Sequence, residues 1–157
     1  MIGAGSGQNV FGKQISATLE DNVVDVSEVK AIPDVHTGYA HTTLGVSGTP
    51  KTVTFAEANE FLTPNMFTEL PSKPPKPDLL LLQLEIPLST VEHLARLAKQ
   101  AGVPVLLNAA PSKHITRDVY LLFDHLVINE IKADFLTGFG DPVGIERRRN
   151  TKYDNII

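Results

Sequence analysis

The sequence predicts an α/β protein in which a small antiparallel β hairpin precedes a parallel β-sheet. After residue 78, continuous apolar runs alternate with amphipathic segments of helical period, the pattern of buried parallel strands joined by crossover helices. Between residues 39 and 56, two stretches rich in threonine, valine and aromatic residues flank a Ser-Gly-Thr-Pro turn, which is typical of a hairpin. The length of 157 residues suits one domain or part of a larger one.

The first element follows the stretch GQNVFGKQ, which is one residue short of a phosphate-binding loop. Gly7, Gly12 and Lys13 have the spacing of that motif, but Gln14 replaces the hydroxyl residue that would bind Mg²⁺. The preceding stretch MIGAGS is too short and too rich in glycine for the buried strand that such a loop requires. We therefore interpret this stretch as a loop that opens an amphipathic helix over residues 9–20. The apolar positions predicted to face a core are Val10, Ile15 and Leu19.

The next segment contains the hairpin. Residues 23–35 are predicted to be extended or irregular, and residues 39–46 and 51–56 to form two antiparallel strands with one face in water. A short helix is predicted to start at Pro64, because proline is favoured in the first helical turn. The proline-rich stretch 71–77 cannot continue a helix and predicts a stiff linker.

After the linker, DLLLLQLEIP (78–87) reads as a strand covered on both faces. Ser89 and Glu92 have the spacing of a capping box at the start of the next helix, which should end before Gly102. The helical stripe that should face the sheet is Val91, Leu94, Ala95 and Ala98. Further strands are predicted at 103–108 and 125–129, and further helices at 116–123 and 130–138.

Polar residues stand where each of the three predicted parallel strands ends. These residues are Gln83 and Glu85 on the first strand, Asn108 on the second, and Asn129 and Glu130 on the third. Open parallel sheets bind ligands outside the carboxyl ends of their strands, so this pattern indicates a binding site. Strand ends also meet water and asparagine caps helices well, so a purely structural interpretation stays open.

Composition excludes several classes of protein. A formal net charge of -4 gives no reason to expect nucleic acid as a partner, and no apolar run has the length of a membrane span. The absence of cysteine excludes disulfides and thiolate metal sites, which suits a cytoplasmic location. None of the five histidines has the spacing of a zinc motif, so no metal ligand or catalytic residue is assigned from spacing.

The ordered motifs resemble the ribokinase branch of the PfkB carbohydrate kinase family. LLLLQLEIPLSTVEHLARLAKQAGVPVLLNAAPS and FDHLVINEIKADFLTG are similar to its successive "QLE-x-P", "LN-x-AP" and "PNE-x-E…LTG" segments. FGKQISATLEDNVVDVSEV and TGYAHTTL are similar to the loop, helix and lid strand that precede them. The resemblance implies a partial ribokinase-like domain over 1–138, with a three-layer parallel sheet. It divides that domain into a lid hairpin at about 37–56, the linker 71–77 and a βαβ core at 78–138.

The resemblance also implies a function, namely transfer of a phosphoryl group from ATP to a sugar hydroxyl, with Mg²⁺ and often K⁺. Glu85 would then contact the sugar, for which ribose is the default, and Asn129 would lie near the ATP phosphates. Asn108 would line the site between them. A lid hairpin of this kind also implies a possible homodimer.

Three departures limit the resemblance. The family's N-terminal sugar-binding loop has no counterpart, and neither has the C-terminal Gly-Ala-Gly-Asp loop that supplies the anion hole and the catalytic base. GAGS at residues 3–6 imitates that loop, but Ser6 is no carboxylate base. Lys132 occupies the position of an acid that helps to organise Mg²⁺. The tail 139–157 matches nothing recognisable.

Two functional hypotheses follow. In the first, the chain is a central fragment of a sugar kinase and is inactive by itself. In the second, it is a non-catalytic binding or dimerisation module, in which the hairpin pairs with the hairpin of a second copy through its exposed edges.

Overall fold

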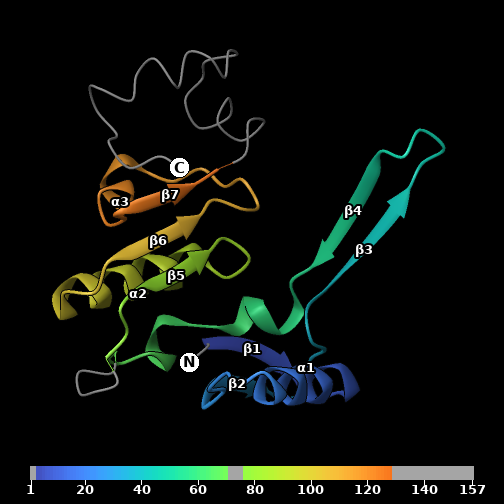
Figure 1. The fold of residues 1–157 in the computed structure, drawn as a ribbon, viewed down its shortest axis with the longest axis horizontal. Coiled ribbons are helices and arrows are strands. Elements are labelled where there is room, and N and C mark those ends of the chain that lie inside the picture. Colours follow the sequence, from blue (N-terminus) through green and yellow to red (C-terminus); the bar gives the residue numbers. More distant parts are fainter. Residues whose placement is uncertain (1–2, 71–75, 129–157) are drawn as a thin grey trace. The chain divides into compact units, whose positions relative to one another are not determined.

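The computed structural model describes residues 3–70 and 76–128 (Figure 1). These residues form two compact units that divide after Thr63. The first unit contains β1 (Gly3–Gly7), α1 (Val10–Asp21), β2 (Glu28–Ile32), β3 (Tyr39–Leu44), β4 (Pro50–Phe55) and the 3-10 helix η1 (Glu57–Phe61). The second contains the 3-10 turn η2 (Pro64–Met66), β5 (Leu80–Gln83), α2 (Leu88–Ala101), β6 (Val105–Asn108), α3 (Arg117–Tyr120) and β7 (His125–Val127).

Strand β1 corrects the sequence analysis, which excluded a strand before Gly7. β1 pairs with β2 in parallel, from Gly3 opposite Glu28 to Gly7 opposite Ile32. Its glycines permit close approach of other backbone segments. A Cβ atom on Gly5 would lie 2.6 Å from the Ala58 carbonyl oxygen, and one on Gly7 would lie 2.4 Å from the His36 carbonyl carbon. The glycine content that argued against a strand therefore allows this one to be packed tightly.

Helix α1 lies where it was predicted, but its apolar stripe does not face a core. Val10 is 60% exposed, Ile15 is 48% exposed and Leu19 is half-buried. Gly12 is instead the buried residue of this helix, and a Cβ atom there would lie 2.1 Å from the Gly7 carbonyl oxygen. The helix thus approaches β1 by backbone contact at a glycine, which periodicity alone does not reveal.

Strands β3 and β4 form the predicted antiparallel hairpin, with Tyr39 opposite Phe55 and Leu44 opposite Pro50. The rings of Tyr39 and Phe55 stack with centroids 4.6 Å apart. All six residues of each strand are exposed, so the expectation of a single wet face was wrong. The hairpin extends away from β1, β2 and α1, and therefore both of its faces meet water (Figure 1).

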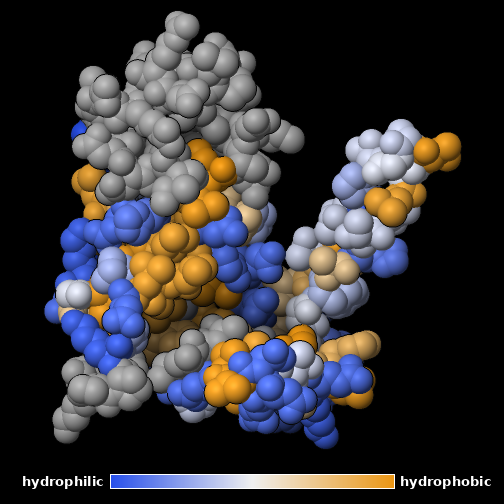
Figure 2. Space-filling model, in the orientation of Figure 1, coloured by the Kyte–Doolittle hydropathy of each residue, from blue (hydrophilic) through white to orange (hydrophobic). Residues whose placement is uncertain are grey.

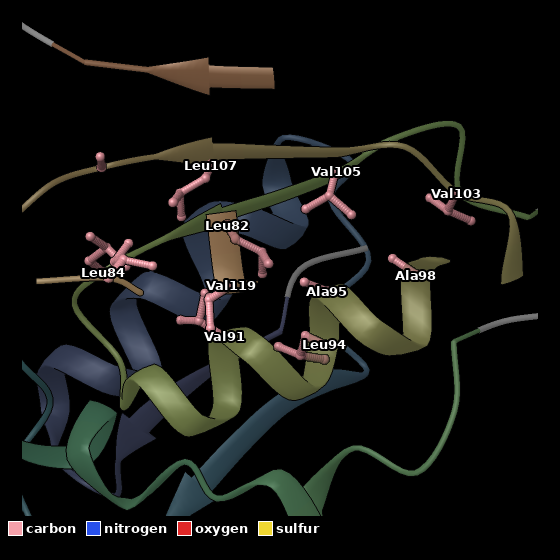
Figure 3. Close-up of a cluster of buried hydrophobic side chains, with 12 residues drawn as sticks. Leu82, Leu84, Val91, Leu94, Ala95, Ala98, Val103, Val105, Leu107 and Val119 are labelled. Carbon is pink, nitrogen blue, oxygen red and sulfur yellow. The ribbon is translucent and has the colours of Figure 1, made fainter. Parts of the chain in front are cut away.

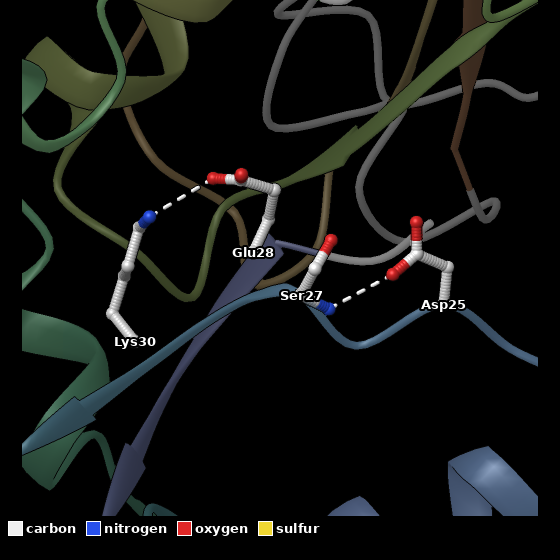
Figure 4. A network of polar contacts seen from close by, with 4 residues as sticks. All are labelled: Asp25, Ser27, Glu28 and Lys30. Carbon is white, nitrogen blue, oxygen red and sulfur yellow. Dashed lines mark hydrogen bonds and ion pairs between the residues drawn. The ribbon is translucent and has the colours of Figure 1, made fainter. Parts of the chain in front are cut away.

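Local polar contacts are made by the turn that precedes β2 and by β2 itself (Figure 4). The Ser27 backbone N–H donates to the Asp25 carboxylate over 2.9 Å, and the Lys30 ammonium lies 2.9 Å from the Glu28 carboxylate. Hydrogen bonds from Ser27 hold the pKa of Asp25 below its ordinary value, because they favour the charged carboxylate. The larger effect comes from the backbone N–H and the smaller from the hydroxyl. The region 23–35, predicted as extended or irregular, thus contains a turn and then strand β2.

The second unit is built on the predicted parallel sheet, in the order β5-β6-β7. Leu82 lies opposite Leu107, and Leu107 lies opposite Leu126. Helix α2 packs against this sheet through the predicted stripe, whose four side chains are at most 8% exposed (Figure 3). The helix ends at Gly102 as predicted, in a left-handed conformation with φ of 64°.

The start of α2 differs from the prediction. The helix begins at Leu88, with Pro87 as its N-cap residue and no side-chain capping bond. Ser89 therefore lies inside the helix, and Glu92 pairs with Arg96 over 2.6 Å on its exposed surface. Proline suits this start, because it lacks the N–H group that the first turn would leave unpaired.

The face of the sheet opposite α2 is less covered than predicted. Leu81 was expected to be buried in a strand covered on both faces, but it is 65% exposed. Figure 2 shows hydrophobic side chains at the surface over β5–β7. The helix predicted from Pro64 is the single 3-10 turn η2. The predicted helix 130–138 and most of the linker 71–77 lie outside the described residues.

Candidate functional site

The carboxyl edge of the three-stranded sheet brings polar residues together. The register places Gln83 beside Asn108, and Asn108 beside Val127. Glu85 lies two residues beyond the end of β5 and is exposed. Its backbone N–H donates to the Gln83 side-chain oxygen. The edge therefore presents a carboxylate and two amide groups to the same region of the second unit.

Backbone hydrogen bonds continue past the strand ends and hold this edge in place. The Leu84 N–H donates to the Ala110 carbonyl over 2.9 Å, and the Ala109 N–H donates to the Val127 carbonyl over 3.0 Å. Leu84 and Ala109 are themselves buried. Because these bonds join all three strand ends, the polar side chains project from a fixed platform rather than from loose loops.

Lys113 is a residue at this edge that the sequence analysis missed. Its ammonium donates to the Ile86 carbonyl over 3.2 Å, and thus ties the loop after β6 to the loop after β5, next to Glu85. Lys113 is half-buried. The signal available in the sequence was its place shortly after the second polar strand end, where a cation could serve an anionic ligand.

The structure thus places two of the predicted site residues, Glu85 and Asn108, at one edge of one sheet. Asn129, Glu130 and Lys132 lie outside the described residues. A carboxylate such as Glu85 can accept hydrogen bonds from hydroxyl groups, and the Asn108 amide can both donate and accept. The described part of the edge therefore suits a ligand rich in hydroxyl groups.

Within residues 3–70 and 76–128, no three carboxylate, histidine or cysteine side chains gather into a metal site. The described residues therefore offer no such side-chain cluster for Mg²⁺. In proteins Mg²⁺ is commonly held by substrate phosphates together with one or two carboxylates, so a nucleotide could bring the ion with it. In the same part of the chain, no helix combines the length and the apolar character needed to cross a membrane.

The phosphate-loop resemblance fails, but for a different reason from the one that the sequence indicated. β1 does deliver the chain to α1, so the strand–loop–helix context is present. However, the Gly7 N–H donates to the Thr37 hydroxyl over 3.0 Å, and the Gly12 N–H donates to the Asn9 side chain over 3.0 Å. These amides are engaged by side chains and cannot also bind a phosphate there. The GAGS stretch lies within β1, where Ser6 is buried.

Comparison with known proteins decides the family. The model of the pfkB family carbohydrate kinases matches residues 6–150, which is most of the chain. This chain belongs to the pfkB family. The match extends into the stretch 139–157, in which the sequence analysis found no likeness.

Among curated relatives, the ribokinase of Haemophilus influenzae is 31% identical to this pfkB-family chain over 132 residues, or 84% of the chain and 43% of the relative. The ribokinase of Schizosaccharomyces pombe is 30% identical and is covered to 42%. The solved structure of Arabidopsis thaliana ribokinase with ribose and ATP matches with a TM-score of 0.76 and 25% identity, over 98% of this chain and 52% of that one. The chain therefore spans less than half of the length of these curated relatives, and the predicted ribokinase-like fold is confirmed.

Proposed function

We propose that the protein is an ATP-dependent sugar kinase that phosphorylates a hydroxyl group of ribose or a similar pentose. Membership of the pfkB family supports this proposal, as does the ribokinase of Arabidopsis thaliana, whose structure was solved with ribose and ATP. The observation that supports it most directly is that Asn108 ends β6 and Glu85 follows the end of the adjacent strand β5, at the carboxyl edge of the parallel sheet.

In this proposal Glu85 accepts a hydrogen bond from a sugar hydroxyl, and Asn108 lines the space between sugar and nucleotide. Asn129 would approach the ATP phosphates, and Mg²⁺ and K⁺ would accompany the nucleotide. In this proposal the residues of this chain bind and orient the sugar and the nucleotide. No residue among them is assigned as the catalytic base. Because the reaction consumes ATP, we expect the protein to act in the cytoplasm.

The test uses a chimera of the Haemophilus influenzae ribokinase. In it, the 132 residues of this chain that align with the ribokinase replace the matching stretch of that protein. In that chimera, Glu85→Ala is expected to weaken ribose binding by about 1.5–3 kcal/mol, the usual value for a hydrogen bond to a charged group. Titration calorimetry with ribose measures this change directly.

The matched control is Glu92→Ala, which removes an equally charged side chain that pairs with Arg96 on the surface of α2. Exposed salt bridges contribute about 0–1 kcal/mol to stability. Loss of the Glu92–Arg96 pair should therefore leave the affinity for ribose unchanged. If Glu85→Ala and Glu92→Ala bind ribose with the same affinity, Glu85 is not a sugar ligand.

The hairpin favours a second candidate function, homodimerisation. Tyr39, Val53 and Phe55 share one face of the hairpin and are 52%, 56% and 41% exposed. Exposed apolar surface of this kind commonly marks an interaction site. We infer that this face packs against the same face of a second copy.

Val53→Glu is therefore expected to shift the protein from dimer to monomer in sedimentation velocity, because it places a charge within the apolar face. Thr54→Glu is the control, since the neighbouring Thr54 points to the opposite face of the hairpin. A wild-type chain that sediments as a monomer at every concentration tested would rule this interface out.

A further inference from the structure

Thr37 lies immediately before the hairpin and is 6% exposed, which is unusual for a threonine next to a strand whose residues all face water. Its hydroxyl oxygen lies 2.8 Å from the Asn9 side-chain oxygen and 3.0 Å from the Gly7 backbone nitrogen. A hydroxyl carries one proton, so it donates to Asn9 and accepts from Gly7. One buried side chain thus joins the root of the hairpin to the end of β1 and to the start of α1.

The Asn9 oxygen that receives this bond also caps helix α1, because it accepts the Gly12 N–H over 3.0 Å. The same oxygen therefore holds both the helix and the hairpin root. The Asn9 amide nitrogen lies 3.3 Å from Nδ1 of His36, which places the residue before Thr37 in the same cluster. Asn9 stands 27 residues before His36 and 28 before Thr37, so it meets them only in the folded unit.

The second leg of the hairpin is held at the same place. The Ala58 N–H donates to the His36 carbonyl over 3.1 Å, just beyond the end of β4. The legs also approach each other closely, since a Cβ atom on Gly38 would lie 2.7 Å from the Ala56 carbonyl oxygen. Both legs are thus fixed at their base, while the strands beyond them are exposed throughout.

We propose that Thr37 is a positioning residue that holds the hairpin at a defined angle to β1, β2 and α1 through its hydroxyl. Within a single chain the rest of the hairpin gains little from packing, because all of its strand residues are exposed, so in the monomer its direction depends on the contacts at its root. A buried hydroxyl that both donates and accepts is suited to this role, since losing it removes the acceptor of the Gly7 N–H and one of the two hydrogen bonds to the Asn9 oxygen.

Thr37→Val and Thr37→Ser form the test pair in the 157-residue chain. Valine keeps the shape of threonine and removes the hydroxyl, whereas serine keeps the hydroxyl. We expect the Gly7 amide to exchange with solvent about tenfold faster in Thr37→Val, as the loss of one buried hydrogen bond implies. Residual dipolar couplings of β3 and β4, measured relative to those of α1, should fall towards zero as the hairpin loses its fixed direction. Thr37→Ser should retain both wild-type values.

Thr42→Val is the control, because its hydroxyl bonds the Thr52 hydroxyl over 2.9 Å on the exposed surface of the hairpin. It should change neither readout. Should Thr37→Val prevent the first unit from folding, Asn9→Ser replaces it, since serine caps a helix well but its shorter side chain withdraws the oxygen that Thr37 reaches. Hairpin couplings that stay at wild-type values in the folded variant, whichever of the two is used, would overturn the proposal.

The consequence for sugar binding rests on the proposed sugar-kinase function and on the lid role that the family resemblance implies for the hairpin. In the ribokinase chimera, Thr37→Val should raise the KM for ribose about tenfold with kcat little changed, and Thr37→Ser should restore it. The residual dipolar couplings are measured without sugar or ATP, and therefore do not depend on the proposed function. If Thr37→Val reduces the residual dipolar couplings of β3 and β4 but leaves the KM for ribose unchanged, only the lid function is contradicted. If the couplings are unchanged, the positioning role of Thr37 is contradicted.

Discussion

Leu107→Ala is expected to lower the free energy of unfolding of the second unit by about 2–5 kcal/mol, the range for truncating a fully buried leucine. Leu107 lies in the middle strand of the sheet and is 0% exposed. It belongs to the cluster shown in Figure 3, between the neighbouring strand β5 and the stripe of α2. Alanine would leave a cavity that this rigid layer can only partly close. Denaturant unfolding followed by circular dichroism measures the loss.

Leu81→Ala is the matched control, because Leu81 lies on the adjacent strand but points to the opposite face and is 65% exposed. Its truncation removes little buried surface and is expected to cost less than about 1 kcal/mol. Equal losses for the two variants would mean that the uncovered face of the sheet is buried in solution, for example by self-association.

The 157-residue chain by itself is expected to phosphorylate ribose no faster than background when ATP, Mg²⁺ and K⁺ are supplied. Phosphoryl transfer needs a positioned nucleophile, a proton acceptor and neutralisation of the transition-state charge. The 157-residue sequence contains no Gly-Ala-Gly-Asp stretch, the loop to which the resemblance assigns the base and the anion hole. Loss of a base typically costs about 10²–10⁴-fold, and loss of one oxyanion donor about 10²–10³-fold. A coupled assay for ADP release checks this expectation.

In the ribokinase chimera, which supplies that loop, Lys132→Glu is expected to raise kcat by about 10–100-fold, the usual effect of residues that support a metal site. If position 132 lies near the metal, as the resemblance implies, a carboxylate there would help to organise Mg²⁺, whereas a lysine would repel it. Lys132→Gln removes the positive charge without adding a carboxylate and should give a smaller gain. Rapid turnover by the unmodified 157-residue chain would contradict the first expectation, and no gain in the Lys132→Glu chimera would contradict the second.

The candidate site could be predicted in part. The position of Glu85 and Asn108 at one edge of the sheet was predictable because each stands near the end of an apolar run, and parallel strands bring such ends to one edge. Lys113 was missed because its partner is the Ile86 backbone carbonyl, 27 residues earlier, and no side-chain pattern reveals such a bond. The roles of Glu85, Asn108 and Asn129 stay predictions, and Asn129 lies outside the described part of the chain.

By itself, the sequence determined the three strands and helix α2 of the second unit and the parallel arrangement of the strands. The stripe of α2 and the left-handed stop at Gly102 are local signals, because side-chain period and glycine conformation act within one or two helical turns. The same holds for the hairpin, whose turn and alternation are contained in fewer than twenty consecutive residues.

Only the tertiary structure decided that GAGSG is a strand, that Val10 and Ile15 face outward, and that one face of the sheet is left exposed. Each of these depends on partners distant in the chain. Gly7 meets Thr37 across 30 residues, and the burial of Leu81 depends on what lies over the sheet. The periodicity of apolar residues indicates which face of an element is apolar. Whether that face is buried depends on which distant segment of the chain packs against it.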